Sequence, residues 1–168
     1  MCAEFVIRAA GPQDSNPIGG LLRASYPALM GPSYDQAVLT AALPFMTKPI
    51  SALLSSGIFY VTESMDHRVV GCGGWSLDRP GSGETIPGLA HIRHFAVHPD
   101  WVRQGIGRAL YEACEDAARR AGVRHVECYS SLNAVVFYTA LGFSSVGRVE
   151  LSVGPDLKIP SVLMERSI

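Results

Sequence analysis

Hydrophobic positions along the chain follow two periods, one typical of strands and one typical of helices. Short alternating or continuous apolar runs rich in valine, isoleucine and aromatic residues predict seven strands, over residues 4–10, 57–64, 68–77, 89–99, 123–131, 144–153 and 157–168. Met65, Asp66 and His67 separate the second run from the third, which predicts a hairpin.

Helical spacing is clearest between Gly105 and Ala121, where apolar residues recur every three or four positions and Gly122 follows as a terminating residue. Four further helices are predicted, over residues 14–25, 33–46, 50–55 and 133–142. We expect Pro27, Gly31 and Pro32 to end the first of these four, Ser33 to cap the second and Pro44 to interrupt it. With no repeat, low-complexity segment or linker, residues 1–168 are expected to form one mixed α/β domain.

Composition narrows the class of protein. Hydrophobic residues make up 48% of the 168 residues and charged residues 17%, which suits a globular domain with its own core. Fourteen basic side chains against fifteen acidic ones argue against nucleic-acid binding by bulk charge. No apolar run reaches the roughly 18 to 20 residues that span a bilayer, and the first residues do not resemble a signal peptide.

The four cysteines, Cys2, Cys72, Cys114 and Cys128, form no CxxC pair, and they are interpreted as reduced thiols of a cytoplasmic protein. No spacing of cysteine, histidine or carboxylate residues suggests a zinc site, so no metal is expected.

The segment RQGIGRAL, residues 103–110, places two glycines at the start of the clearest helix. It is not a dinucleotide fingerprint, because Leu110 stands at the third glycine position, and it is not a P-loop, because the required lysine is absent. Free amides at a helix start favour an anion such as pyrophosphate. The alternative is that Gly105 and Gly107 only permit a tight strand-to-helix turn.

Two motifs together resemble one family. HFAVHPDWVRQGIGRALYEACEDAARRAG is similar to the acetyl-coenzyme A binding motif of the GNAT superfamily of N-acetyltransferases, whose core is Q/R-x-x-G-x-G/A. SSLNAVVFYTALGF resembles the second motif of that family, and the strand HVECYS separates the two in the expected order. The resemblance covers residues 90–143. Val102 departs from it, because the family has glutamine or arginine there; Arg103 follows one residue later.

The resemblance implies a central mixed, mostly antiparallel twisted sheet of six to seven strands flanked by about four helices. It also implies that the strands at 90–97 and 125–130 splay apart to admit acetyl-coenzyme A (acetyl-CoA) as cosubstrate. Pantetheine would pair with the backbone of residues 95–97, and pyrophosphate would lie on the amides of residues 103–108. The implied cofactor-binding residues are Phe95, Ala96, Val97, Arg103, Gln104, Gly105, Ile106, Gly107, Arg108 and Asn133.

The same resemblance implies direct acetyl transfer to a primary amine, of a small molecule or of a protein, with Tyr138 as general acid and the Val97 N–H as oxyanion donor. His91 is the expected base; His94, Glu84, Glu127 and a water relay are its rivals. Asn133 is expected to cap the helix that it precedes and to contact pantetheine.

Two other interpretations stay open at this point. In the first, the domain is a non-catalytic acyl-CoA binding or sensing module. In the second, it is a nucleotide-binding α/β protein, which is disfavoured because the glycine segment matches neither nucleotide-binding motif. The residues that determine acceptor specificity are expected in 12–56 and 154–160. A homodimer is expected only by analogy with the family.

Overall fold

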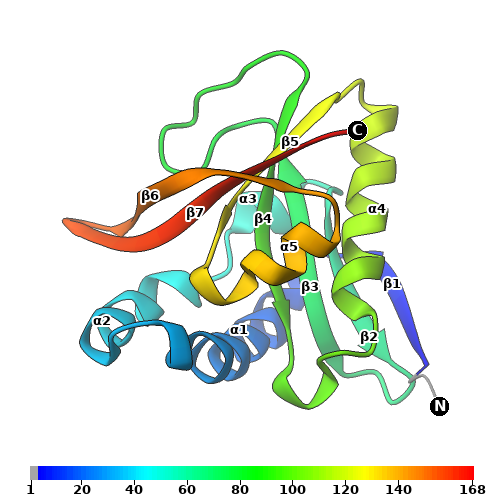
Figure 1. Ribbon diagram of the computed structural model, residues 1–168. Helices are drawn as coiled ribbons and strands as arrows, with labels where there is room; N and C mark the ends of the chain where they lie inside the picture. The colour runs from blue at the N-terminus through cyan, green and yellow to red at the C-terminus, as the bar shows by residue number, and fades with distance from the viewer. Residues whose placement is uncertain (1–3) are drawn as a thin grey trace.

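Seven strands form one sheet in the computed structural model, which describes residues 4–168 (Figure 1). The strand order is β1-β2-β3-β4-β5-β7-β6, and every neighbouring pair is antiparallel except β4 and β5. The strands are β1 (Phe5–Ala9), β2 (Phe59–Ser64), β3 (Val69–Ser76), β4 (Leu89–Val97), β5 (His125–Ser130), β6 (Ser144–Gly154) and β7 (Leu157–Ser167). The expected mixed, mostly antiparallel sheet is confirmed.

Helices cover both faces of this sheet (Figure 1). They are α1 (Ser15–Met30), α2 (Gln36–Met46), α3 (Ser51–Leu54), α4 (Ile106–Arg120) and α5 (Val135–Ala140). Ile18, Leu21 and Leu22 of α1 pack against β2, β3 and the end of β4. On the opposite face, Tyr111 and Cys114 of α4 pack against the start of β4 and against β5. The sheet is therefore the middle of three layers.

Two prolines were expected to end or interrupt helices, and both expectations are wrong. Pro27 lies inside α1 and Pro44 inside α2. Proline removes one N–H from the helical ladder and leaves a carbonyl of the preceding turn without its donor. Both prolines lie on the exposed side of their helices, where water can satisfy that carbonyl, so the helices continue.

The expected cap of α2 is also wrong. Asp35, not Ser33, is its N-cap, and the Asp35 carboxylate accepts hydrogen bonds from the N–H groups of Ala37 and Val38 at 3.0 and 3.2 Å. Gly31, Pro32 and Ser33 instead form a short 3-10 turn after α1. That turn delays the start of α2 by two residues relative to a Ser33 cap.

Strands β4 and β5 pair over a short length. Their register contains three residue pairs: Leu89 with His125, Ala90 with Val126, and His91 with Glu127. Beyond His91 the two strands part, although β4 continues to Val97 and β5 to Ser130. The sheet is therefore splayed at the position where the family resemblance implies a gap.

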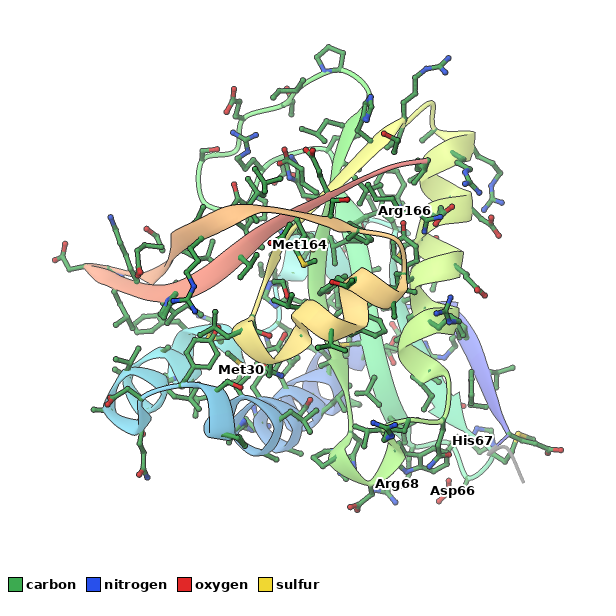
Figure 2. The ribbon with its side chains drawn as sticks, viewed as in Figure 1. Met30, Asp66, His67, Arg68, Met164 and Arg166 are labelled. Carbon is green, nitrogen blue, oxygen red and sulfur yellow. The ribbon has the colours of Figure 1, made fainter. Side chains whose placement is uncertain are left out.

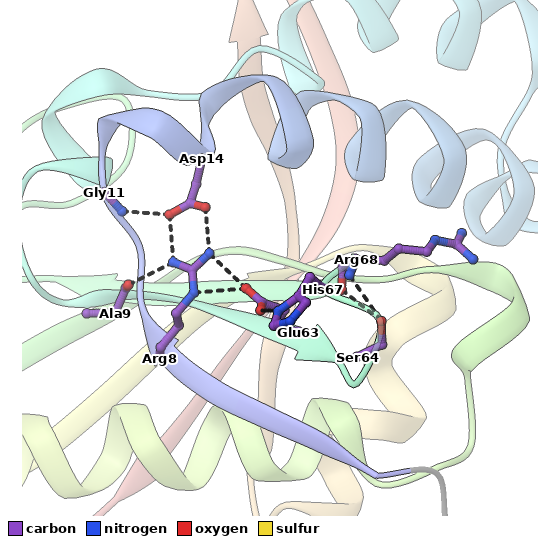
Figure 3. A network of polar contacts seen from close by, with 8 residues as sticks. All are labelled: Arg8, Ala9, Gly11, Asp14, Glu63, Ser64, His67 and Arg68. Carbon is purple, nitrogen blue, oxygen red and sulfur yellow. Dashed lines mark hydrogen bonds and ion pairs between the residues drawn. The ribbon is translucent and has the colours of Figure 1, made fainter.

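Polar contacts join two of the strands to neighbouring helices and strands. The Arg8 guanidinium of β1 bonds both carboxylate oxygens of Asp14 at 2.8 and 2.9 Å and reaches Glu63 of β2 at 3.1 Å (Figure 3). Toward the other side of the sheet, Arg166 of β7 bonds Glu115 of α4 at 2.9 Å, two residues after the fully buried Met164 (Figure 2). These contacts hold β1 to the start of α1 and β7 to α4.

Candidate active site

A cavity of about 840 Å³ occupies the gap between β4 and β5. Its walls come from the second half of β4, the loop that leads into α4, the end of β5, and α5. It extends toward α1, α2 and the β6–β7 hairpin, which are far away in the sequence. The cavity thus has one end at the glycine loop and another between the N-terminal helices and the C-terminal hairpin.

The glycine loop turns through two left-handed residues before α4 begins. Arg103 has φ 61° and Gly105 has φ 82°, and Gly105 is the N-cap of α4. The first helical bond runs from the Ala109 N–H to the Gly105 carbonyl, so the N–H groups of residues 106–108 have no intrahelical acceptor. Free amides and the positive end of the helix dipole meet there, which favours an anion.

Gly107 is required by packing rather than by a left-handed backbone conformation. A Cβ atom at this position would lie 2.9 Å from the Phe137 ring of α5, so the first turn of α4 contacts α5 closely. The Arg108 side chain bonds the Ala140 carbonyl at the end of α5 at 3.3 Å. Together these contacts hold the start of α4 against α5 at the glycine-loop end of the cavity.

Most of the expected cofactor residues line the cavity. The lining contains Phe95, Ala96, Val97, Arg103, Gly105, Ile106, Gly107, Arg108 and Asn133. Gln104 is the exception; its side-chain oxygen is buried and has no hydrogen-bond partner within residues 4–168. Val102 lines the cavity too. Because its side chain is apolar, position 102 itself offers no polar group to an anion, but the backbone amides of residues 106–108 do.

Strand β4 carries a bulge beside the cavity. Arg93 pairs with Gly74 and Ala96 pairs with Cys72, so one extra residue lies on β4 between these pairs. His94, in this bulge, has φ 52°, a conformation that is uncommon outside glycine. A strained backbone position of this kind is frequent in functional sites.

Beyond the bulge, backbone groups of β4 face the gap. The His98 N–H bonds the Val70 carbonyl of β3 at 2.8 Å, so the alternation of a strand turns Val97 the other way. Accordingly, the Val97 carbonyl accepts a hydrogen bond from Ser25 of α1 at 2.8 Å. The Val97 N–H shares this orientation, which leaves it available to a ligand lying along β4.

Tyr138 projects from α5 into the cavity wall. It is 6% exposed and is held by the rings of Phe137, Phe143 and Phe95, at centroid distances of 5.0, 5.4 and 6.5 Å. Its hydroxyl makes no hydrogen bond within the described residues. Burial raises the pKa of Tyr138 well above its usual range, so the hydroxyl keeps its proton at neutral pH.

The two histidines of β4 occupy different surroundings. His91 is 1% exposed, lies where β4 is still paired on both sides, and is not part of the cavity lining. Its Nδ1 is 3.6 Å from the Glu127 carboxylate, yet burial and the neighbouring arginines lower the pKa of His91 to about 4. His94 does line the cavity, and burial, with help from Arg93, lowers the pKa of His94 to about 4 as well.

The two carboxylates considered as bases do not line the cavity either. Glu84 pairs with Arg79 at 2.9 Å, and Glu127 lies 3.5 Å from the same guanidinium. Both therefore act as counter-charges of Arg79 beside the start of β4.

Asn133 does not cap a helix, which corrects that expectation. The chain makes a 3-10 turn over Leu132–Ala134 before α5, so Ser131 and Ala134 hold the two N-cap positions. No side-chain cap bond forms at either position. Asn133 is exposed and lines the cavity, so its side-chain amide is accessible to a ligand there.

Arg93 also lines the cavity, although it was not among the site residues expected from the sequence. The available signal was an arginine within a mainly apolar strand, directly between Ile92 and His94.

Comparisons with known proteins agree with this geometry. The family described as acetyltransferase (GNAT) domain matches residues 55–145. A GCN5-related N-acetyltransferase from Rhodopseudomonas palustris has 20% identity, covers 100% of this chain and 98% of its own, and superposes with a TM-score of 0.78. The PaiA N-acetyltransferase of Thermoplasma acidophilum, solved in complex with coenzyme A, has 15% identity, coverage of 98% and 99%, and a TM-score of 0.69.

A further GCN5-related N-acetyltransferase, from Kribbella flavida, has 23% identity, coverage of 98% of both chains and a TM-score of 0.61. Within residues 4–168, no helix is long and apolar enough to cross a membrane, and no group of three or more histidine, cysteine or acidic residues could hold a metal ion. The matched domain spans the glycine loop and Tyr138 together: the chain belongs to the GNAT family and is an acetyl-CoA-dependent acetyltransferase.

Proposed function

We propose that the enzyme transfers the acetyl group of acetyl-CoA directly to a primary amine, with Tyr138 as the general acid. The observation that carries this proposal is the Tyr138 hydroxyl. It is protonated, makes no hydrogen bond within the described residues, and belongs to the wall of the gap in which the thioester would lie. A buried phenol without a protein partner is well suited to protonate a departing thiolate.

The cofactor would lie along the cavity from the glycine loop to β4. Free amides of residues 106–108 would bind the pyrophosphate, with Arg103, Gly105 and Arg108 beside it. Pantetheine would run along residues 95–97, where the Val97 backbone faces the gap, and Asn133 would contact it from the opposite wall. Gln104 would support the loop from behind, since its side chain is outside the lining.

Groups of this site account for each bond and each proton of the transfer step. The neutral amine nitrogen attacks the thioester carbon and forms a C–N bond, while the Val97 N–H donates to the oxygen that becomes negative. The C–S bond then breaks, and the thiolate takes the proton of Tyr138. The amine proton restores the Tyr138 hydroxyl. One further proton, from the ammonium form of the acceptor, must leave before attack.

For that earlier proton we propose His94 in place of His91. His94 lines the cavity and is neutral at pH 7, since its pKa is lowered to about 4. The low pKa makes the imidazole a weak base, so it would relay the ammonium proton to water rather than keep it. His91 is nearly fully buried and outside the lining, which leaves it no direct route to the amine. The strained bulge at His94 also favours this assignment.

The proposal is tested by thiol release from acetyl-CoA with a panel of primary amines. Tyr138→Phe should lower kcat by roughly 10² to 10⁴ while the dissociation constant for coenzyme A stays within about threefold of wild type. Tyr60→Phe, at a tyrosine of β2 outside the cavity lining, is the matched control. Full activity of Tyr138→Phe would refute the acid role; coenzyme A binding without turnover of any amine would favour a sensing module.

A further inference from the structure

The end of the cavity away from the glycine loop has an apolar wall. Its side chains come from the C-terminal half of α1, from α2 and the segment after it, and from the β6–β7 hairpin: Leu29, Met30, Phe45, Met46, Ile50, Leu151, Val153 and Ile159. Met30 is at the end of α1, below α5 in Figure 2. Phe45 and Ile50 are 47% and 38% exposed although they are large and apolar. A wall of this kind favours an apolar group of the acceptor.

The charged side chains that line the cavity are all arginines. Within residues 4–168, no aspartate or glutamate lines the cavity. Arg103 and Arg108 belong to the glycine loop, so Arg93 is the cation at the acceptor end. An acceptor whose charge is only positive, such as a diamine or a lysine side chain, would find no counter-charge in this lining and would meet a guanidinium. An acceptor with a carboxylate would be complementary.

Arg93 is placed to bind such a carboxylate. Its side chain is 11% exposed, and its contacts run through Nη1, to Ser76 Oγ at 2.9 Å and to Asp78 at 3.4 Å. Nε and Nη2 have no hydrogen-bond partner within the described residues. Asp78 competes only weakly with a substrate carboxylate for Arg93, because the Asp78 side chain is 57% exposed and its contact with Arg93 is long. A partly desolvated guanidinium with free donors is suited to bidentate carboxylate binding.

From these observations we infer that the acceptor is an α-amino acid with an apolar side chain, whose carboxylate binds Arg93 and whose side chain contacts the apolar wall. The inference rests on the proposed amine acetylation and specifies its substrate. Arg93 immediately precedes His94 on β4. Because both residues line the cavity, an acceptor whose carboxylate binds Arg93 would lie in the same cavity as His94 and the thioester arm along β4.

The test compares L-leucine with 3-methylbutylamine, which lacks only the carboxylate, and with leucinamide, which lacks its charge. The wild-type enzyme should have a kcat/KM for leucine at least about tenfold above both. In Arg93→Gln, KM for leucine should rise roughly tenfold to a hundredfold while the constants for 3-methylbutylamine change little, as expected for losing a charged hydrogen bond. Arg124→Gln, at an exposed arginine outside the cavity, should leave every constant unchanged.

Two further variants keep the test decisive if Arg93→Gln folds poorly. Arg93→Lys keeps the charge without the planar fork and should give an intermediate KM for leucine. Asp78→Asn removes the competing carboxylate and should lower that KM. Preference of the wild-type enzyme for 3-methylbutylamine, or an equal loss of both substrates in the Arg93 variants, would overturn the inference and leave amine acetylation standing.

Failure of the proposed function gives a different result. If no amine releases thiol, leucine binding to the coenzyme A complex is measured by calorimetry. Binding that weakens in Arg93→Gln but not in Arg124→Gln would support the carboxylate site, and no binding to the wild-type complex would overturn it.

Discussion

His91 should make the stability of the domain depend on pH. Its imidazole is 1% exposed, its Nδ1 has no hydrogen-bond partner within residues 4–168, and Arg79 and Arg93 are close enough to disfavour a positive charge. These conditions lower the pKa of His91 to about 4 from the 6.5 of a free histidine. A shift of this size corresponds to about 3 kcal/mol of unfolding free energy.

The direction follows from proton binding. Between the two pKa values, the unfolded chain protonates His91 and the folded chain does not, so the unfolded state binds more protons. The contribution of His91 to stability is therefore complete above pH 6.5 and is lost as the pH falls toward 4. At the steepest point the loss approaches about 1.4 kcal/mol per pH unit.

Urea unfolding, followed by fluorescence between about pH 7 and about pH 4.5, measures this dependence for the wild type and for His91→Gln. The variant differs in absolute stability, so only its slope against pH is compared. We expect a shallower slope for His91→Gln, and His125→Gln, at an exposed histidine, controls for the loss of a surface imidazole. Parallel curves for wild type and His91→Gln, within about 1 kcal/mol across the range, would refute the reasoning.

Three shorter predictions follow from the same structure. Gly107→Val should weaken coenzyme A binding at least about tenfold in calorimetry, because its side chain would enter the contact with Phe137 and disturb the amides of the first turn of α4. Asp14→Asn should lower the unfolding free energy by about 2 kcal/mol in urea at pH 7, since it weakens the paired bonds to Arg8; the deficit should shrink at low pH, because Arg8 holds the pKa of Asp14 below its usual value. The kcat of the enzyme should stay level from about pH 9 to about pH 6 and fall only toward pH 4, the pKa region of His94; a fall centred near 6.5 would contradict that base.

The parts of the site that depend on neighbouring residues in the chain were predictable from the sequence. Helix α4 follows from apolar spacing and begins within one residue of the expected position. The left-handed φ of Gly105 follows from a turn that glycine makes cheaply. Val102, which departs from the family pattern, was the open question of this loop. Because the N–H groups of residues 106–108 lack intrahelical acceptors, an anion can be bound there without a polar side chain at position 102.

The choice of base and the acceptor end could not be predicted, because both depend on how far β4 and β5 stay paired. Alternation along β4 says which residues share a face, but not where the cavity begins. The last pair is His91 with Glu127, so His91 stays inside the sheet while Arg93 and His94, two and three residues later, reach the gap.

The extra residue of the bulge then changes the alternation, so that Phe95 and Val97 face α4 while Ala96 faces α1. No local pattern encodes the length of a parallel pairing or its bulge, since both result from packing between segments far apart in the chain. The role of Arg93, and the choice of His94 over His91, therefore follow only once the point of strand separation is known.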